Sequence, residues 1–304
     1  MIRPPGAPTC PACLGITEPT TITVTAEGAL RRLHRCIGCG SQSWSGGEHA
    51  VSTYWEGYKG IQAFDLYKNP ETIAAYHARY AKAYDAMVEA LGRAPTRVLD
   101  YGGGIGNYAA WLEGKNVATL TMDADEAAVE AAKGRGLHAC LPEGASSQAE
   151  DGGFDAVTLW DVVEHTNEPV DLLASALKYV APGGITFLET PDAGFLLRTA
   201  VRASHRASRG HLDASAPLYY WEHKVYLTLQ GLRTLLARNG FGIVWVDRWT
   251  SPRGKMVNIF DRESEGDSQP GLYRAMARAY PIASAAVEFF GGGNKLVVVA
   301  RRVS

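Results

Sequence analysis

Short apolar runs alternate with amphipathic segments through most of this chain. Runs typical of buried strands lie at 97–100, 117–122, 137–141, 155–160, 184–190, 241–248 and 295–302. Segments with apolar residues three or four positions apart, typical of helices, lie at 107–114, 125–133, 169–180 and 228–238. Strands that alternate with helices in this way predict an α/β fold, in which helices cover both faces of a mainly parallel sheet.

A longer helix is expected before the first of these strands. The start Asn69-Pro70-Glu71 offers a capping side chain, a proline suited to the first turn and an acid near the positive end of the helix dipole. We expect this helix to reach Leu91. Three tyrosines at every fourth position share one of its faces, and we expect them to pack into the core. They are Tyr76, Tyr80 and Tyr84.

The segment 97–123 carries the clearest chemical pattern, and it reads RVLDYGGGIGNYAAWLEGKNVATLTMD. Asp100 closes the first apolar run, and Asp123 follows the second. Glycines between them let the backbone turn sharply and approach a ligand without a Cβ in the way. Ligands bind at the carboxyl ends of the strands in an open parallel sheet, so we expect a binding crevice here. The glycines at alternating positions are Gly102, Gly104 and Gly106.

The two acids indicate which ligand this crevice accepts. One alternative is that the glycines form a tight turn with no ligand. The other is a dinucleotide-binding loop, which would hold a pyrophosphate at a helix N-terminus. A carboxylate at Asp100 would repel that pyrophosphate, whereas it would suit a ligand with an ammonium, a sulfonium and no phosphate. Asp123 can accept both hydroxyls of a ribose. The pattern therefore favours S-adenosylmethionine, with a dinucleotide as the alternative.

Two later blocks strengthen this interpretation. Residues 154–192 read FDAVTLWDVVEHTNEPVDLLASALKYVAPGGITFLETPD, and residues 221–241 read WEHKVYLTLQGLRTLLARNGF. With the glycine loop, they resemble class I S-adenosylmethionine-dependent methyltransferases of the subgroup that includes ubiquinone-pathway O-methyltransferases. The resemblance covers residues 96–304. It implies a Rossmann-like seven-stranded sheet whose last strand is antiparallel, and it implies cofactor contacts at Trp160 and Asp161.

One position departs from the resembled family. That family commonly places an acid after the third strand to meet the adenine amino group, but this chain has Ala139 and Cys140 there. We therefore expect backbone groups around Cys140 and Leu141, or a side chain placed elsewhere, to take over adenine recognition.

Two histidines are candidates for the catalytic base. Methyl transfer from a sulfonium needs an acceptor held in line and, for a hydroxyl or amine, a base that removes its proton. His165 follows the fourth strand, although in the resembled family its Glu164-His165 pair often orients the loop instead. His223 lies among aromatic residues suited to an aromatic or sugar-like acceptor. The aromatic candidates for acceptor contact are Tyr220, Trp221 and Tyr226.

The N-terminal region has metal-ligand spacing. Two CxxC pairs flank a segment that predicts a β-hairpin, with strands near 20–25 and 30–35. Two such pairs joined by a hairpin predict a zinc ribbon in which four thiolates hold a structural zinc. Disulfides and a redox motif are the alternatives. The ligand candidates are Cys10, Cys13, Cys36 and Cys39, and Cys140 is left as a small apolar residue.

Arginines in the segment 198–211 suggest the character of the acceptor. Arg198, Arg202 and Arg206 repeat every four residues, so a helix would place them on one basic face. Such a face is often only solvated. As a functional feature it would contact an acidic acceptor, such as a nucleotide-linked sugar, a phosphorylated metabolite or an acidic carrier protein.

The length of 304 residues suggests more than one module, and we divide the chain into a zinc ribbon at 1–52, a linker and helix over the cofactor site at 53–95, and a methyltransferase domain at 96–304. A net charge of −2 implies no general attraction to nucleic acid or membrane. Apolar runs too short to span a bilayer, and a start without a signal-peptide pattern, predict a cytoplasmic protein.

Three functions of different class follow. The first is a methyltransferase acting on a small molecule in secondary-metabolite, cofactor or sugar biosynthesis, with the methylated atom and the oligomeric state left open. The second is an RNA methyltransferase that grips nucleic acid with the ribbon. Residues 1–52 hold four arginines, no lysine and three glutamates, and a net charge of +1 is weak for that role. The third is a non-enzymatic partner protein, which the intact glycine loop and both acids disfavour.

Overall fold

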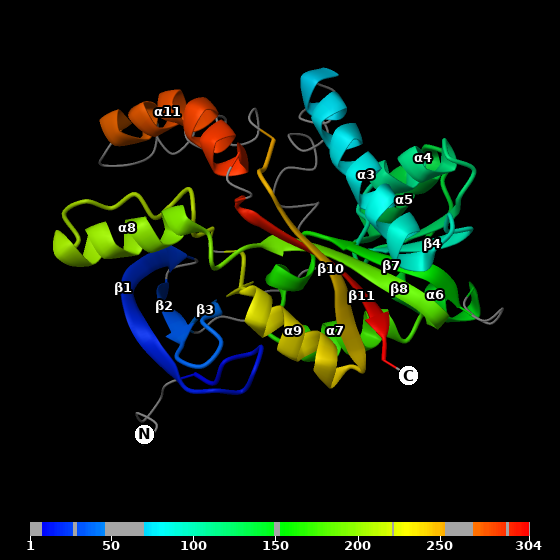
Figure 1. Ribbon diagram of the computed structural model, residues 1–304, viewed down its shortest axis with the longest axis horizontal. Coiled ribbons are helices and arrows are strands. Elements are labelled where there is room, and N and C mark those ends of the chain that lie inside the picture. The colour runs from blue at the N-terminus through cyan, green and yellow to red at the C-terminus, as the bar shows by residue number, and fades with distance from the viewer. Residues whose placement is uncertain are drawn as a thin grey trace.

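The computed structural model describes residues 8–26, 29–45, 70–148, 153–220, 222–252, 270–289 and 292–303. Within these ranges the chain forms a seven-stranded sheet flanked by helices and a second, four-stranded sheet (Figure 1). No helix of the described part is long and apolar enough to cross a membrane.

The large sheet has the predicted topology. In spatial order its strands are β10 (Phe241–Trp249), β11 (Lys295–Arg302), β8 (Val180–Pro191), β7 (Phe154–Trp160), β4 (Arg97–Tyr101), β5 (Ala118–Met122) and β6 (Ala139–Cys140). β11 runs antiparallel to both of its neighbours, and the remaining pairs are parallel. The expected Rossmann-like sheet with an antiparallel last strand is therefore confirmed. β8 begins earlier than expected, because Val180 already pairs with Phe154.

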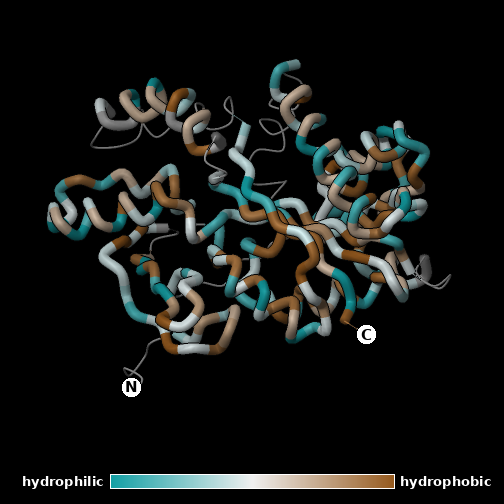
Figure 2. Tube along the Cα trace, viewed as in Figure 1, coloured by the Kyte–Doolittle hydropathy of each residue, from teal (hydrophilic) through white to brown (hydrophobic). Residues whose placement is uncertain are grey.

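Helices cover both faces of this sheet. They are α3 (Pro70–Leu91), α4 (Asn107–Glu113), α5 (Glu126–Gly134), α6 (Pro142–Gln148), α7 (Pro169–Leu177) and α9 (Leu229–Arg238). The described part also contains α8 (Leu196–Ala207), which packs on the small sheet, and α11 (Pro270–Phe289). Successive strand residues face opposite sides, so Val297 packs in the core layer under α3 and α4, and Val298 in the layer under α7 and α9. Figure 2 shows apolar segments along the central strands.

The predicted tyrosine face of α3 lies in the core. Tyr80 is 6% exposed, and its ring centroid lies 4.9 Å from that of Tyr108 and 5.2 Å from that of Trp160. Tyr76 and Tyr84 pack against the same cluster. Trp160, expected to contact a cofactor, also packs against Phe187, with the two ring centroids 4.6 Å apart. These rings join α3 to the carboxyl ends of the central strands.

The small sheet contains the predicted N-terminal hairpin. Its strands are β1 (Thr17–Ala26), β2 (Ala29–Cys36), β3 (Gln42–Trp44) and β9 (Val225–Tyr226), in that order. β3 extends the hairpin, because Gln42–Trp44 pairs with both β2 and β9. The first part of the expected linker, 53–69, lies outside the described residues.

Candidate functional site

The loop between β4 and α4 turns at the carboxyl edge of the large sheet. Gly102 and Gly103 donate their N–H groups to Met122 O at 2.7 and 3.1 Å, which holds the loop against β5. Gly104 and Gly106 have φ angles of 56° and 75°, a conformation that favours glycine. The alternating glycines thus let the chain pass closely over the ends of two strands, where a ligand can approach the backbone.

Asp100 lies directly beneath this loop. Its side chain is almost completely buried and accepts a hydrogen bond from Thr158 Oγ1 at 2.8 Å. A Cβ at Gly103 would lie only 2.5 Å from Asp100 Oδ2, so the loop backbone packs against this carboxyl group. Burial raises the pKa of Asp100 to about 7, and the Asp123 carboxylate acts in the same direction. The site therefore favours a cation beside Asp100.

Asp123 ties the glycine loop to the end of β5. Its Oδ2 accepts from Gly104 N at 2.8 Å and its Oδ1 from Asp125 N at 2.9 Å. Burial raises the pKa of Asp123 as well. Its own N–H donates to Cys140 O at 3.2 Å, so one of the backbone groups expected to meet adenine already has a partner. The two acids lie on adjacent parallel strands, as predicted.

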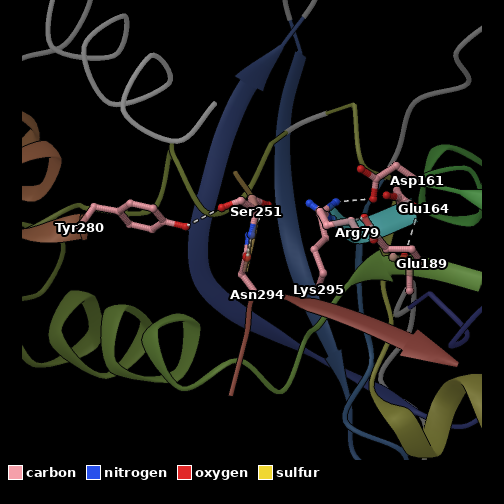
Figure 3. A network of polar contacts seen from close by, with 9 residues as sticks. Arg79, Asp161, Glu164, Glu189, Ser251, Tyr280, Asn294 and Lys295 are labelled. Atoms are coloured by element: carbon pink, nitrogen blue, oxygen red, sulfur yellow. Dashed lines mark hydrogen bonds and ion pairs between the residues drawn. The ribbon is translucent and has the colours of Figure 1, made fainter. Parts of the chain in front are cut away.

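Buried ion pairs lie at the same edge, where β7 and β8 end and β11 begins (Figure 3). Arg79 of α3 pairs with Glu189, and Lys295 pairs with Asp161. Glu189 is 3% and Lys295 5% exposed. Asp161, expected to contact a cofactor, has a φ of 53° and directs one carboxylate oxygen to Lys295. These pairs fix α3 and β11 around the strand ends.

The structure brings the two candidate bases together. His165 ends a short 3₁₀ helix, η2 (Val163–His165), and His223 precedes β9. Their ring centroids are 4.9 Å apart, with the rings nearly perpendicular. Burial lowers the pKa of His223 well below its usual range, and positive charge on His165 and Lys295 acts in the same direction. His223 is therefore favoured in the neutral form that a general base needs.

Glu164 lies beside this pair and is completely buried. It accepts from Thr190 Oγ1 at 3.0 Å. The ligand atoms of Glu164, His165 and His223 lie within 4.8 Å of one another, and such a set could hold a divalent ion. However, burial and the Asp161 carboxylate raise the pKa of Glu164 well above its usual range. A raised pKa favours the protonated carboxyl, whereas a metal ligand has to be deprotonated.

The residues expected to contact an acceptor occupy different positions. Tyr220 is half-buried at ring-contact distance from His223, with centroids 5.3 Å apart. Tyr226 is completely buried, and its hydroxyl donates to Tyr220 O at 2.8 Å. Arg198 is 4% exposed and lies over the Tyr226 ring. Both side chains are thus buried in this structure, and their contact with an acceptor stays a prediction. Trp221 lies outside the described residues.

The predicted single basic face on α8 is also wrong. Arg198 points into the core while Arg206 is exposed, because the helix packs its Val201 side against the small sheet. Arg202 is half-buried and donates to Tyr219 Oη at 3.0 Å. It lines a pocket of about 240 Å³ between α8 and β2–β3, together with Arg35, and none of the described residues that line this pocket is acidic.

The four N-terminal cysteines converge on one point. Their sulfurs lie within 4.8 Å of one another, and all four thiols are free. Cys10 and Cys39 Sγ are 3.7 Å apart, and Cys13 and Cys36 Sγ are 3.4 Å apart. Zinc–sulfur bonds of about 2.3 Å in a tetrahedron place the sulfurs roughly 3.8 Å apart, so the cluster fits a zinc ion. Four thiolates would fill its coordination and leave a structural role.

Several residues at the carboxyl edge of the large sheet were not predicted from the sequence. Gly103 and Glu189 stood inside the quoted motifs, where their positions after β4 and in β8 pointed to them. Arg79 and Lys295 offered no local pattern, because each gains its meaning only from a partner on another element.

Comparison with known families agrees with this geometry. Residues 73–246 match the methyltransferase domain family. The match covers more than half of the chain, and the chain belongs to this family.

Curated relatives are more distant. The chain is 27% identical over 151 residues to a ubiquinone biosynthesis O-methyltransferase of Acinetobacter baylyi, which covers 40% of this chain and 62% of that protein. It is 29% identical over 125 residues to the Psychrobacter arcticus protein of the same name, covering 36% and 47%. The chain thus spans less than two thirds of each relative.

Solved structures share the fold. Magnesium protoporphyrin IX methyltransferase from Synechocystis PCC 6803, with bound S-adenosylhomocysteine, superposes with a TM-score of 0.52 at 14% identity, covering 83% of this chain and 98% of that one. A plantazolicin methyltransferase complex gives 0.50 at 14% identity, covering 84% and 95%.

Proposed function

We propose that this protein transfers a methyl group from S-adenosylmethionine to a small-molecule acceptor. The observation that carries the proposal is the pair of acids at adjacent strand ends, Asp100 and Asp123, joined by the glycine loop in a chain of the methyltransferase domain family. The ammonium of the donor would restore charge to Asp100, whose buried carboxyl has a raised pKa. Asp123 would accept from the ribose hydroxyls.

The bound donor supplies a methyl group already activated by its sulfonium. The chain has to hold the acceptor in line and exclude water. The aromatic cluster of Tyr80 and Trp160 packs α3 against the end of β7 and would help to close the crevice on the α3 side. His223 would accept the acceptor's proton, since its lowered pKa keeps it neutral, and His165 would orient its ring.

An acidic acceptor is supported by the pocket beside α8. Arg35 and Arg202 line it, and Arg202 binds only neutral partners among the bonds found for the described residues. Guanidinium groups suit phosphate or carboxylate. Biosynthesis of a phosphorylated or sugar-containing metabolite would supply such an acceptor, and the distant relatives act in a biosynthetic pathway according to their names.

Turnover tests the proposal. The protein is incubated with S-adenosylmethionine and a panel of phenols, sugar phosphates and RNA, and S-adenosylhomocysteine is measured by mass spectrometry. We expect formation with a small molecule, and a loss of about 10²–10⁴-fold in His223→Gln but not in His211→Gln, an exposed control. Product formation with RNA alone would favour the RNA methyltransferase, and none with any acceptor would count against an enzyme.

A further inference from the structure

The four-stranded sheet is completed by the methyltransferase domain itself. β9 pairs antiparallel with β3, with Gln42 opposite Tyr226 and Ser43 opposite Val225. Trp44 N donates to Lys224 O at 3.2 Å and extends the pairing. The cysteine-bearing hairpin is therefore hydrogen-bonded to the segment 222–228, which carries His223.

Thr228 connects the second cysteine pair to the same segment. Its Oγ1 donates to Cys39 O at 2.6 Å, and its N–H donates to Ser41 Oγ at 3.2 Å. The same Oγ1 accepts from Gly231 N at 3.0 Å and so caps the first turn of α9. The Thr228 hydroxyl thus joins the loop that carries Cys39 to the first turn of α9.

The first turn of α9 packs directly on the cysteine loops. A Cβ at Gly231 would overlap Ser41 Oγ and would lie 3.4 Å from Ala12 Cβ, between the first cysteine pair. Leu232 of α9 shares a hydrophobic cluster with buried Cys10. Figure 1 shows the hairpin beside α9, with α8 above it in this view.

The same segment also contacts the ends of β7 and β8, where the candidate bases lie. Lys224 N donates to Glu164 O at 2.6 Å, and Leu227 forms a bridge with Asp192 at the end of β8. His223 meets His165 in the same stretch. The glycine loop follows β4 and is held by Met122 of β5, on the side of β4 away from β8, although Gly102 also packs against Val162 next to η2.

We propose that the zinc ribbon positions His223 and the segment 222–228 around it. Loss of the metal should therefore change the structure of this segment and leave the cofactor crevice at the glycine loop unchanged. Thr228 and Gly231 are the positioning residues. The ribbon acts as a built-in support of the active site instead of a separate docking module. Only the role given to His223 rests on the proposed function.

Hydrogen exchange of the full chain, loaded with zinc or stripped by a chelator, tests this without an acceptor. Removal of the metal should speed amide exchange in 222–231 by roughly tenfold or more, with 97–106 unchanged. Affinity for S-adenosylhomocysteine should stay within about twofold in calorimetry. Faster exchange confined to 8–45 would overturn the proposal. Equally fast exchange in the glycine loop, 97–106, would also overturn it. Failure of the loaded protein to bind S-adenosylhomocysteine would instead refute the proposed function.

Two variants with matched controls test the positioning residues. Thr228→Val should weaken zinc binding about tenfold, at the low end for groups that support metal ligands, and Thr228→Ser should restore it. Gly231→Ala should act in the same direction. Two controls should leave zinc binding unchanged: Thr234→Val, whose hydroxyl donates to Gln230 O of its own helix, and Gly134→Ala, where a Cβ would meet none of the described residues within 4 Å.

The pKa of His223 tests whether Thr228 and Gly231 position this side chain. In zinc-loaded Thr228→Val and Gly231→Ala, the pKa of His223 followed by NMR should rise toward its ordinary value of 6.5, because the ring loses burial. An unchanged pKa with weakened zinc binding would overturn the positioning role.

Discussion

Replacing Asp100 by Asn should stabilise the folded protein and at the same time weaken its binding of the cofactor. Burial raises the pKa of Asp100 from 3.8 to about 7. At about 1.4 kcal/mol per unit, that shift means the carboxylate destabilises the folded state by at most about 4 kcal/mol at neutral pH. Asn keeps an oxygen that can accept from Thr158. We expect a gain of roughly 1–3 kcal/mol, since the new amide also needs a partner.

The dependence of this gain on pH has a definite sign. A carboxyl whose folded pKa is raised costs nothing below its unfolded pKa near 4, and its cost grows as the pH rises toward 7. The stability difference between Asp100→Asn and wild type should therefore vanish near pH 4 and be largest at pH 7 and above. Chemical denaturation at several pH values measures it.

Binding should change in the opposite direction. Asn cannot supply the negative charge that the donor's ammonium would meet, so affinity for S-adenosylmethionine should fall about 10–100-fold, in line with hydrogen bonds to charged groups. S-adenosylhomocysteine should lose a similar factor if Asp100 meets the ammonium, which both molecules carry. Calorimetry measures both ligands on the same variant.

Asp155→Asn is the matched control. Asp155 lies at the start of β7 and accepts from Arg93 and from Thr96 N at 2.7 Å. Although burial opposes it, these donors lower the pKa of Asp155, so the same substitution there should destabilise the protein. A destabilised Asp100→Asn, or one that binds S-adenosylmethionine as wild type does, would refute the reasoning about this crevice.

Three further outcomes follow. Gly103→Ala should abolish binding of S-adenosylhomocysteine in calorimetry, because its Cβ meets Asp100. Arg79→Met should destabilise by about 3–5 kcal/mol in denaturation, while Arg79→Met with Glu189→Leu should recover most of the loss; equal losses would contradict a buried pair. Turnover should persist below pH 6.5, since burial lowers the pKa of His223, and a fall centred at 6.5 would argue against it as the base.

Much of the fold could be predicted because its strands are short, apolar and punctuated locally. The run before Asp100 and the glycines after it fixed the first strand and its turn, and CxxC spacing located the thiol cluster without any long-range knowledge. The match of Asp123 to the next strand end followed from the parallel alternation alone.

The rest depends on contacts between distant segments. β9 has only two residues, and it is a strand because it pairs with the edge of β3. A segment this short has no hydrophobic periodicity that could predict it. Arg198 belongs to a four-residue repeat typical of an exposed face, yet Tyr226 draws it into the core through its ring. Local patterns cannot distinguish a solvated arginine from a stacked one, and this is why the burial of Arg198 could not be predicted from the sequence.

The central claim is that the crevice at β4 and β5 accepts a cationic adenosyl donor and excludes a phosphate-bearing one. Titration calorimetry of the wild-type chain with S-adenosylmethionine, S-adenosylhomocysteine and NAD at neutral pH tests it directly. We predict saturable heat with the first two and none with NAD. Binding of NAD without a response to either adenosyl compound would contradict the account.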